Sequence, residues 1–358
     1  MHIFHVVGAR PNFVKAAPVM RAFGRFHSVR QTLIHTGQHY DANMSDVFFQ
    51  ELGMPQPKHN LSVGAGSHAV QTAEIMSRFE PKVLHYKPDL VLVYGDVNST
   101  LAAALVCAKL EISIGHVEAG LRSFDRTMPE EINRLLTDQI SDWLFTPFAD
   151  ATENLLREGI GVEKIHLVGN VMIDTLVRCL PLAEAGRILT SLRLEARRYA
   201  LVTLHRPSNV DDSATLDSLF EALNEISRRL PLVFPIHPRT RERLASGEVR
   251  QLSSGVHVTD GLGYLEFLAL MRDAQLVITD SGGIQEETTF LGVPCITLRE
   301  NSERPVTATL GTNVLVGRNV KRLRAEVDRV LVGHGRQGSV PPLWDGHAAE
   351  RIANAIVR

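Results

Sequence analysis

The chain has 358 residues, of which 44% are hydrophobic and 22% are charged, and its net charge at neutral pH is -2. This composition is ordinary for a globular protein, and the length fits two domains of similar size. The near-neutral charge excludes a broad attraction to nucleic acid or to an anionic membrane, so an anion has to bind at a local site.

The cysteines and the first residues predict a cytoplasmic protein. Cys107, Cys179 and Cys295 lie far apart in apolar surroundings, which is typical of reduced, buried thiols and not of a metal site. The first eight residues form a strand pattern without the basic and apolar regions of a signal peptide. No apolar run reaches the roughly 18 residues of a membrane helix.

Short apolar runs alternate with longer helical patterns in the first half of the chain, as in βαβ units. The run at 90–93 is apolar throughout, which is typical of parallel strands that are buried on both faces. Helices are expected, for example, at 68–86 and 99–110. Strands are expected at 2–7, 31–36, 89–94, 112–117, 142–147 and 165–168.

The pattern restarts near residue 199, after a connector at 171–198. Strands are expected at 199–204, 232–236, 256–258, 275–279, 294–298 and 313–316. Helices are expected near 212–229, 264–273, 283–291 and 320–332. The sequence therefore predicts an α/β protein with two Rossmann-like domains, 1–170 and 171–345, whose ligand-binding sheet edges face an interdomain cleft. A helix at 346–358 is expected to pack back on the first domain.

The first motif with chemical character is Gly-Ala-Arg-Pro-Asn-Phe-Val-Lys at residues 8–15, directly after the first strand. Glycine permits a tight turn there, and the following helix start can present N–H groups to an anion. Arg10 and Lys15 add positive charge where the helix dipole alone would disfavour it. We therefore expect an anion or carboxylates at this end; the alternative is a surface turn with solvated basic residues.

Three acidic residues of the first domain are candidates for acid–base chemistry. Asp96 ends a buried strand, where parallel sheets bind their ligands, although its motif also suits a helix cap. Glu118 ends the next strand, and partial burial among small residues suits a general acid or base; the alternative is an ion pair with Arg122. Glu130 follows Pro129, as at an ordinary helix start, but a short loop can bring it beside Glu118.

Two histidine motifs follow strands of the second domain. In Leu-His-Arg-Pro at 204–207, His205 can titrate near neutral pH and Arg206 can bind a phosphate. His237 occupies a similar place after the next strand. The alternative for both histidines is a structural role without chemistry.

The motif Thr-Asp-Ser-Gly-Gly-Ile-Gln-Glu-Glu at 279–287 predicts a nucleotide diphosphate site. A hydroxyl and exposed N–H groups at a helix start suit phosphate oxygens, and Glu287 can reach ribose hydroxyls. Arg299, Glu303 and Arg304 follow the next strand and can complete the site. A glycine-rich turn without a ligand is the alternative. The chain contains no Walker loop, and the Gly-Ala-Gly at 64–66 follows no convincing strand, so a nicotinamide cofactor is not expected.

Together these motifs resemble the non-hydrolysing UDP-N-acetylglucosamine 2-epimerases, from residue 3 to about 317. The resemblance implies the GT-B architecture, a homodimer, a UDP-sugar substrate, no cofactor or metal, and a product that feeds polysaccharide synthesis. The catalytic residues that it implies are Asp96, Glu118, Glu130 and His205. The binding residues that it implies are Arg10, Lys15, Arg206, Phe267 beside the uracil, Ser281, Gly282, Gly283, Glu287 and Arg304.

The family reaction is an elimination of UDP to 2-acetamidoglucal, followed by re-addition. Two departures from the family pattern stand out. Gly-Ala-Arg-Pro-Asn replaces the usual Gly-Thr-Arg-Pro-Glu, and the segment after Gln38-His39 lacks the glutamines that bind an activating second substrate. Activation by substrate is therefore not implied. The alternatives are an epimerase of a related UDP-sugar such as a diacetamido-uronic acid, a hydrolysing epimerase, a GT-B glycosyltransferase and a nucleotide-sugar-binding regulator.

Overall fold

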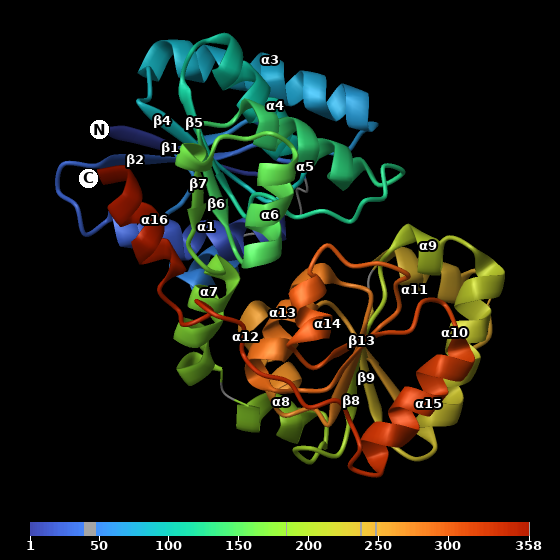
Figure 1. Ribbon diagram of the computed structural model, residues 1–358. Helices are drawn as coiled ribbons and strands as arrows, with labels where there is room; N and C mark the ends of the chain where they lie inside the picture. Colours follow the sequence, from blue (N-terminus) through green and yellow to red (C-terminus); the bar gives the residue numbers. More distant parts are fainter. Residues whose placement is uncertain (39–47, 184, 237, 248, 358) are drawn as a thin grey trace. The chain divides into compact units, whose positions relative to one another are not determined.

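The computed structural model describes residues 1–38, 48–183, 185–236, 238–247 and 249–357. The chain forms two compact units. The first unit contains Met1–Arg178 and Pro342–Arg358, and the second contains Cys179–Pro341. Each unit has one sheet with helices on both faces, as Figure 1 shows for each unit separately. Among the described residues, no helix combines the length and the apolar character needed to cross a membrane.

The sheet of the first unit is entirely parallel, and its order is β3-β2-β1-β4-β5-β6-β7. Its central strands β1 and β4 are fully buried; β4 has a continuous run without charged residues, whereas β1 also buries His2 and His5. The strand order reverses between β1 and β4. In a doubly wound sheet, ligands are expected at the carboxyl ends of the strands beside such a reversal. The strands are β1 (His2–Val7), β2 (Arg30–His35), β3 (His59–Asn60), β4 (Leu90–Tyr94), β5 (Ser113–Val117), β6 (Trp143–Thr146) and β7 (Ile165–Leu167).

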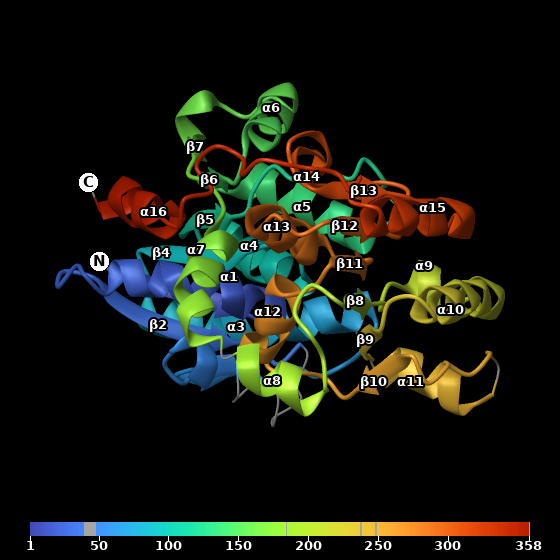
Figure 2. The same ribbon diagram turned by 90° about the horizontal axis from the view of Figure 1, so that it is seen from below.

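Helices cover both faces of this sheet. α3, α4 and α5 lie on one face, and α1 and α16 lie together on the other (Figures 1 and 2). Their bounds, with those of the remaining elements, are α1 (Arg10–Phe23), α3 (His68–Tyr86), α4 (Asn98–Lys109), α5 (Pro129–Ile140), α6 (Ala149–Arg157), a 3-10 turn (Val162–Lys164), α7 (Val171–Cys179) and α16 (Ala348–Val357).

The second unit repeats this plan with the sheet order β10-β9-β8-β11-β12-β13, again all parallel. The order reverses between β8 and β11. α10 and α15 pack on one face over a core that includes Phe220 and Leu323, and α12 and α13 lie on the other. The strands are β8 (Ala200–Thr203), β9 (Leu232–Pro235), β10 (Val256–Thr259), β11 (Leu276–Thr279), β12 (Cys295–Thr297) and β13 (Asn313–Leu315). The helices are a 3-10 turn (Leu180–Leu182), α8 (Ala185–Ser191), α9 (Pro207–Val210), α10 (Ser213–Ser227), α11 (Pro238–Ala245), α12 (Tyr264–Arg272), α13 (Gly282–Leu291), α14 (Pro305–Thr309) and α15 (Val320–Leu331).

The predicted α/β class with two Rossmann-like domains is confirmed by these two sheets. The division between the units falls after Arg178 and not after residue 170, so most of α7 lies in the first unit. Thr175 Oγ1 donates to the Val14 carbonyl oxygen at 2.6 Å, which attaches α7 to α1. At the other end of the second unit the chain returns at Pro342, and the indole of Trp344 donates to the Pro147 carbonyl oxygen at 3.1 Å.

Asp174 holds the start of the C-terminal helix. Its two carboxylate oxygens accept the backbone N–H groups of Ala348 and Ala349 at 3.1 and 2.7 Å. These N–H groups belong to the first turn of α16. N–H groups in the first turn of a helix have no acceptors within their own helix. Burial raises the pKa of Asp174 from 3.8 to about 6, although the two N–H groups oppose this shift.

We expect Asp174→Ala to lower the free energy of unfolding by about 1–3 kcal/mol, because two buried N–H groups lose their acceptor. Urea denaturation followed by circular dichroism measures this effect. Asp174→Asn keeps one acceptor oxygen and should cost less. Because the folded chain binds the Asp174 proton more tightly than the unfolded chain, its stability contribution falls as the pH rises from 3.8 toward 6, and Asn should remove that slope. Equal stability of Asp174→Ala and the parent chain would rule out this anchor.

Candidate active site

Glu118 forms a buried ion pair at the carboxyl end of β5. Its Oε2 lies 2.6 Å from Lys15 Nζ, and both side chains are almost fully buried. Glu118 has a backbone φ of +76°, which is strained for a residue with a side chain and is typical of functional sites. A Cβ at Gly95 would lie only 2.8 Å from Lys15 Nζ, so the glycine leaves the space that the lysine occupies.

The alternative of an ion pair between Glu118 and Arg122 is wrong. Arg122 instead lies beside Asp138 and Glu158, with its Nη1 2.7 Å from Asp138 Oδ2. The carboxylate of Asp138 also accepts from His116 Nδ1 at 2.6 Å. Burial alone would raise the pKa of Asp138, but His116 and Arg122 hold it below its usual range.

His116 connects this buried group to the turn that carries Asp96. Its Nε2 lies 2.8 Å from the Gly95 carbonyl oxygen, while its Nδ1 faces Asp138. The ring thus lies between the Asp138 carboxylate and the Gly95 carbonyl oxygen. The histidine therefore fixes the backbone immediately before Asp96.

Asp96 lies after β4, at the reversal of strand order, and is partly exposed. Its Oδ2 accepts from Arg134 Nε at 3.0 Å, and its backbone carbonyl accepts from the Asn133 amide at 2.9 Å. Arg134 is buried on α5. The carboxylate is therefore held in place from one side by a charged hydrogen bond, which is a strong type of contact.

The two glutamates at the start of α5 have different environments. Glu131 is buried and accepts hydrogen bonds from Ser123 N and Phe124 N, both at 2.9 Å, and from Arg134. Glu130 is partly exposed, and within the described residues its carboxylate accepts no hydrogen bond. Glu131 thus joins the loop before α5 to the arginine that holds Asp96, whereas Glu130 is available to a ligand.

The start of α1 presents fewer N–H groups than the sequence predicts. The side-chain oxygen of Asn12 accepts from Gly8 N and Ala9 N at 2.9 and 3.0 Å, so these two groups are already bonded. The amide of Asn12 donates to the Tyr94 carbonyl oxygen at 2.7 Å. Arg10 lies over the ring of Phe48, with its guanidinium carbon 5.3 Å from the ring centre. Positive charge here therefore comes from Arg10 and Lys15, with little contribution from the turn.

In the second unit, Asp280 orients the segment that carries His205. The buried carboxylate accepts from the backbone N–H groups of His205 and Arg206 and from the Asn209 amide. It also lies 3.0 Å from His205 Nδ1, while the imidazole stays substantially exposed. Burial opposes ionisation of Asp280, but His205 holds its pKa below the usual range. A carboxylate behind Nδ1 directs the opposite ring nitrogen away from the core, as in many catalytic histidines.

Helix α13 begins at Gly282 with positive charge close by. The hydroxyl of Ser281 makes no capping bond to the helix. A Cβ at Gly282 would lie 2.5 Å from Arg304 Nη1, so glycine is needed where the guanidinium packs. Arg304 pairs with Glu286 at 3.0 Å and with Glu303 at 2.8 Å.

Glu303 is shared by three arginines. Arg299 lies 2.6 Å from its carboxylate, Arg206 lies 3.7 Å away, and Arg304, the residue before α14, lies 2.8 Å away. Three guanidinium groups therefore lie near the start of α13, together with the carboxylates of Glu303 and Glu286. A helix N-terminus with adjacent arginines is well suited to a diphosphate.

Glu287 and Phe267 lie on the neighbouring helices α13 and α12. Glu287 is buried, and Phe267 is partly buried. Burial and the adjacent Glu286 carboxylate raise the pKa of Glu287 to about 7, and a hydrogen bond from Tyr264 opposes the shift. These residues could hold the nucleoside part of a ligand whose phosphates face the start of α13.

The sequence model of the UDP-N-acetylglucosamine 2-epimerase family matches residues 21–357. The chain belongs to this family. It is 44% identical to the UDP-N-acetylglucosamine 2-epimerase of Methanocaldococcus jannaschii, with 99% of each chain covered. It is also 44% identical to the UDP-2,3-diacetamido-2,3-dideoxy-D-glucuronate 2-epimerase of Pseudomonas aeruginosa, with both chains fully covered. The resemblance expected from the motifs is confirmed.

Solved structures of epimerases of this family have the same fold. The M. jannaschii enzyme in complex with UDP-GlcNAc and UDP matches with a TM-score of 0.93 at 43% identity, covering 100% of this chain and 99% of that chain. The Neisseria meningitidis enzyme bound to UDP-GlcNAc matches with a TM-score of 0.90 at 28% identity over the full length of both chains. A glycosyltransferase of kitacinnamycin, 16% identical with a TM-score of 0.58, shares the fold alone.

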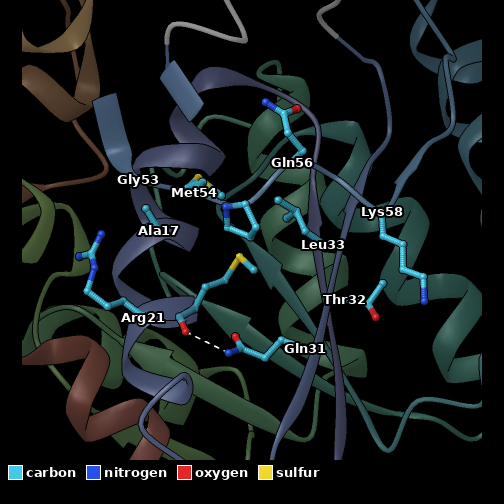
Figure 3. Close-up of a pocket in the computed structure, with 11 residues that line it drawn as sticks. Ala17, Arg21, Gln31, Thr32, Leu33, Gly53, Met54, Gln56 and Lys58 are labelled. Atoms are coloured by element: carbon cyan, nitrogen blue, oxygen red, sulfur yellow. Dashed lines mark hydrogen bonds between the residues drawn. The ribbon is translucent and has the colours of Figure 1, made fainter. Parts of the chain in front are cut away.

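The epimerase motifs do not coincide with a hollow of about 290 Å³ in the first unit, between α1 and β2 (Figure 3). Arg21 and Lys58 are the charged residues among the described residues that line it. Gln31 lies at its edge, where its amide donates to the Met20 carbonyl oxygen at 3.1 Å. Among the described residues that line it there is no carboxylate.

Sequence reasoning missed several residues that hold the candidate site residues in place. Glu131 and Arg134 lie three positions apart on α5, a spacing that predicts contact on a helix and could have been used. Asp280 belongs to the motif at 279–287, but its contact with His205 could not be predicted. The contact joins the ends of β8 and β11, which pair in the sheet and are far apart in the sequence. His237 and residues 39–47, on which two further expectations fall, lie outside the described residues.

Proposed function

We propose that the chain interconverts UDP-N-acetylglucosamine and UDP-N-acetylmannosamine by inverting C2 of the sugar. The observation that carries the proposal is the set of three carboxylates, Asp96, Glu118 and Glu130, two of them at neighbouring strand ends and all in one unit. Two relatives at 43% and 44% identity over nearly the whole chain are UDP-N-acetylglucosamine 2-epimerases.

The chemistry explains why several carboxylates are needed. The C2 hydrogen is not adjacent to a carbonyl, so its direct removal is slow. If the C1–O bond to UDP breaks, positive charge at C1 makes this proton acidic, and a carboxylate can accept it. The products of this step are 2-acetamidoglucal and UDP. Re-addition of UDP, with a proton delivered to the opposite face of C2, completes the inversion and requires a second acid–base group.

In this proposal the second unit binds the UDP part of the same substrate. Ser281, Gly282 and Gly283, with Arg206 and Arg304, stabilise the diphosphate as it departs. His205 and Arg10 act on the same developing charge, and Lys15 acts through Glu118. Phe267 and Glu287 hold the uridine. No nicotinamide or metal takes part in any step.

Epimerisation, hydrolysis and transfer give different products. We expect incubation with UDP-N-acetylglucosamine alone to give UDP-N-acetylmannosamine with deuterium at C2 when the solvent is D2O, as observed by proton NMR. Free N-acetylmannosamine would instead support a hydrolysing epimerase. A requirement for an acceptor, without deuterium at C2, would support a glycosyltransferase, and absence of turnover with tight UDP binding would support a regulator.

The sugar needs a test of its own, because the P. aeruginosa relative named for a diacetamido-glucuronate and the M. jannaschii UDP-N-acetylglucosamine 2-epimerase are both 44% identical to this chain. A second incubation with UDP-2,3-diacetamido-2,3-dideoxy-D-glucuronate tests this alternative. We expect turnover of UDP-N-acetylglucosamine to have the higher kcat/KM. Faster turnover of the uronate would reassign the substrate and keep the epimerisation chemistry.

We also propose that the enzyme is a cytoplasmic homodimer that supplies precursors for polysaccharide synthesis. The family resemblance supports the dimer and the role of the product. The three cysteines are free and buried, which is in keeping with a reducing compartment. Light scattering of the purified chain tests the dimer: a mass of about 40 kDa, the mass of one chain, would contradict it.

A further inference from the structure

Tyr264 makes a buried contact with Glu287 that the proposed reaction does not use. Its hydroxyl donates to Glu287 Oε1 at 2.8 Å. Tyr264 is 6% exposed and Glu287 is 4% exposed. The tyrosine is the first residue of α12, and the glutamate lies on α13, so the bond joins two neighbouring helices.

The two oxygens of Glu287 are not equivalent. Oε1 accepts from Tyr264, whereas no hydrogen bond from a described residue reaches Oε2. A buried carboxyl group with one committed oxygen and one uncommitted oxygen is costly unless a ligand completes its hydrogen bonds. The uncommitted oxygen is thus the one that can meet a ligand hydroxyl.

The groups around Glu287 make its orientation depend on the tyrosine. Glu286, the preceding residue on α13, is paired with Arg304 and repels the Glu287 carboxylate. Within the described residues no cation pairs with Glu287, so the Tyr264 hydroxyl is the donor that holds it.

We propose that Tyr264 is a positioning residue for nucleotide binding: its hydroxyl fixes one oxygen of Glu287 so that the other faces the ribose hydroxyls of the UDP-sugar. The inference rests on the proposed function, in which Glu287 binds the ribose. Phe267 follows Tyr264 by three positions on α12, so one helix turn supplies both the positioning hydroxyl and the ring assigned to the uracil.

The test is to compare Tyr264→Phe with the parent chain for binding of UDP and of 2′,3′-dideoxy-UDP by calorimetry. We expect the variant to bind UDP about tenfold more weakly, the effect of one hydrogen bond to a charged or buried group. Its affinity for dideoxy-UDP should stay unchanged, because that ligand has no ribose hydroxyl for Glu287. Tyr199→Phe is the matched control: its buried hydroxyl donates to the Leu270 carbonyl oxygen at 2.6 Å, and its loss should affect neither ligand.

The pH dependence of UDP binding gives a second readout. Since the hydrogen bond from Tyr264 lowers the pKa of Glu287, its removal should move the midpoint of this dependence to higher pH, and Tyr199→Phe should leave it in place. Equal weakening of both ligands by Tyr264→Phe, or no weakening of UDP, would overturn the proposal. A parent chain that binds UDP and dideoxy-UDP equally would also overturn it, while a parent chain that binds neither would contradict the proposed function itself.

Discussion

Asp96→Asn is expected to lower turnover by about 100- to 10,000-fold, the usual contribution of a positioned general acid or base. Asparagine keeps the shape of the side chain, and its oxygen can still accept from Arg134 Nε, which lies 3.0 Å from Asp96 Oδ2. It cannot accept or return the C2 proton. UDP should therefore still bind, and the loss should appear in kcat when product formation is followed by NMR.

Asp89→Asn is a matched control for this variant. Asp89 precedes β4, whereas Asp96 follows it. The Asp89 carboxylate accepts from the His2 N–H at the amino ends of the strands, away from Asp96. Its replacement should leave turnover unchanged. If Asp96→Asn turned over at nearly the parent rate, Asp96 would have no part in the proton transfer.

Lys15→Met is expected to lower the free energy of unfolding by about 3–5 kcal/mol, because it leaves the Glu118 carboxylate buried without its charge partner. The Nζ and Oε2 atoms are 2.6 Å apart, with the side chains 4% and 3% exposed. Turnover should fall as well, since Lys15 no longer holds the Glu118 carboxylate in place. Denaturant unfolding and NMR turnover measure the two effects separately.

Two further variants show whether the buried carboxylate causes the loss. Glu118→Gln added to Lys15→Met removes the carboxylate that Lys15 contacts and should restore part of the stability, but not turnover. Arg25→Met breaks an ion pair with Glu350 that is largely exposed, and should cost less than about 1 kcal/mol. A loss no larger for Lys15→Met than for Arg25→Met would mean that the buried pair has no special role.

The strands and their ligand-binding ends could be predicted because their signals are local. Apolar runs such as β4 fall within a residue of the expected bounds, since a strand buried on both faces needs continuous apolar sequence. Asp96, Glu118 and Ser281 could be assigned to sheet edges for the same reason. The edge strand β3 was missed, because His59–Asn60 is only two polar residues long and has no such pattern.

The contacts between distant segments could not be predicted from local patterns. Lys15 and Glu118 are far apart along the chain, and the sequence suggested Arg122 as the partner of Glu118 because it is near in sequence. Arg122 is drawn away by Asp138 and Glu158, which the fold brings to it. Lys15, on α1, takes the place of Arg122 beside Glu118. Its position depends on the parallel pairing of β1 with β4 and of β4 with β5.

Epimerisation by elimination requires cleavage of the C1–O bond, and one measurement tests this cleavage directly. UDP-N-acetylglucosamine labelled with ¹⁸O in the bridge between C1 and the β-phosphorus is incubated with the enzyme, and the position of the label is followed by ³¹P NMR. Because UDP released within the site can rotate its terminal phosphate, we predict that the label spreads to the non-bridging oxygens as epimerisation proceeds. Formation of UDP-N-acetylmannosamine with all of the label still in the bridge would contradict this mechanism, in which the released UDP rotates before it adds back.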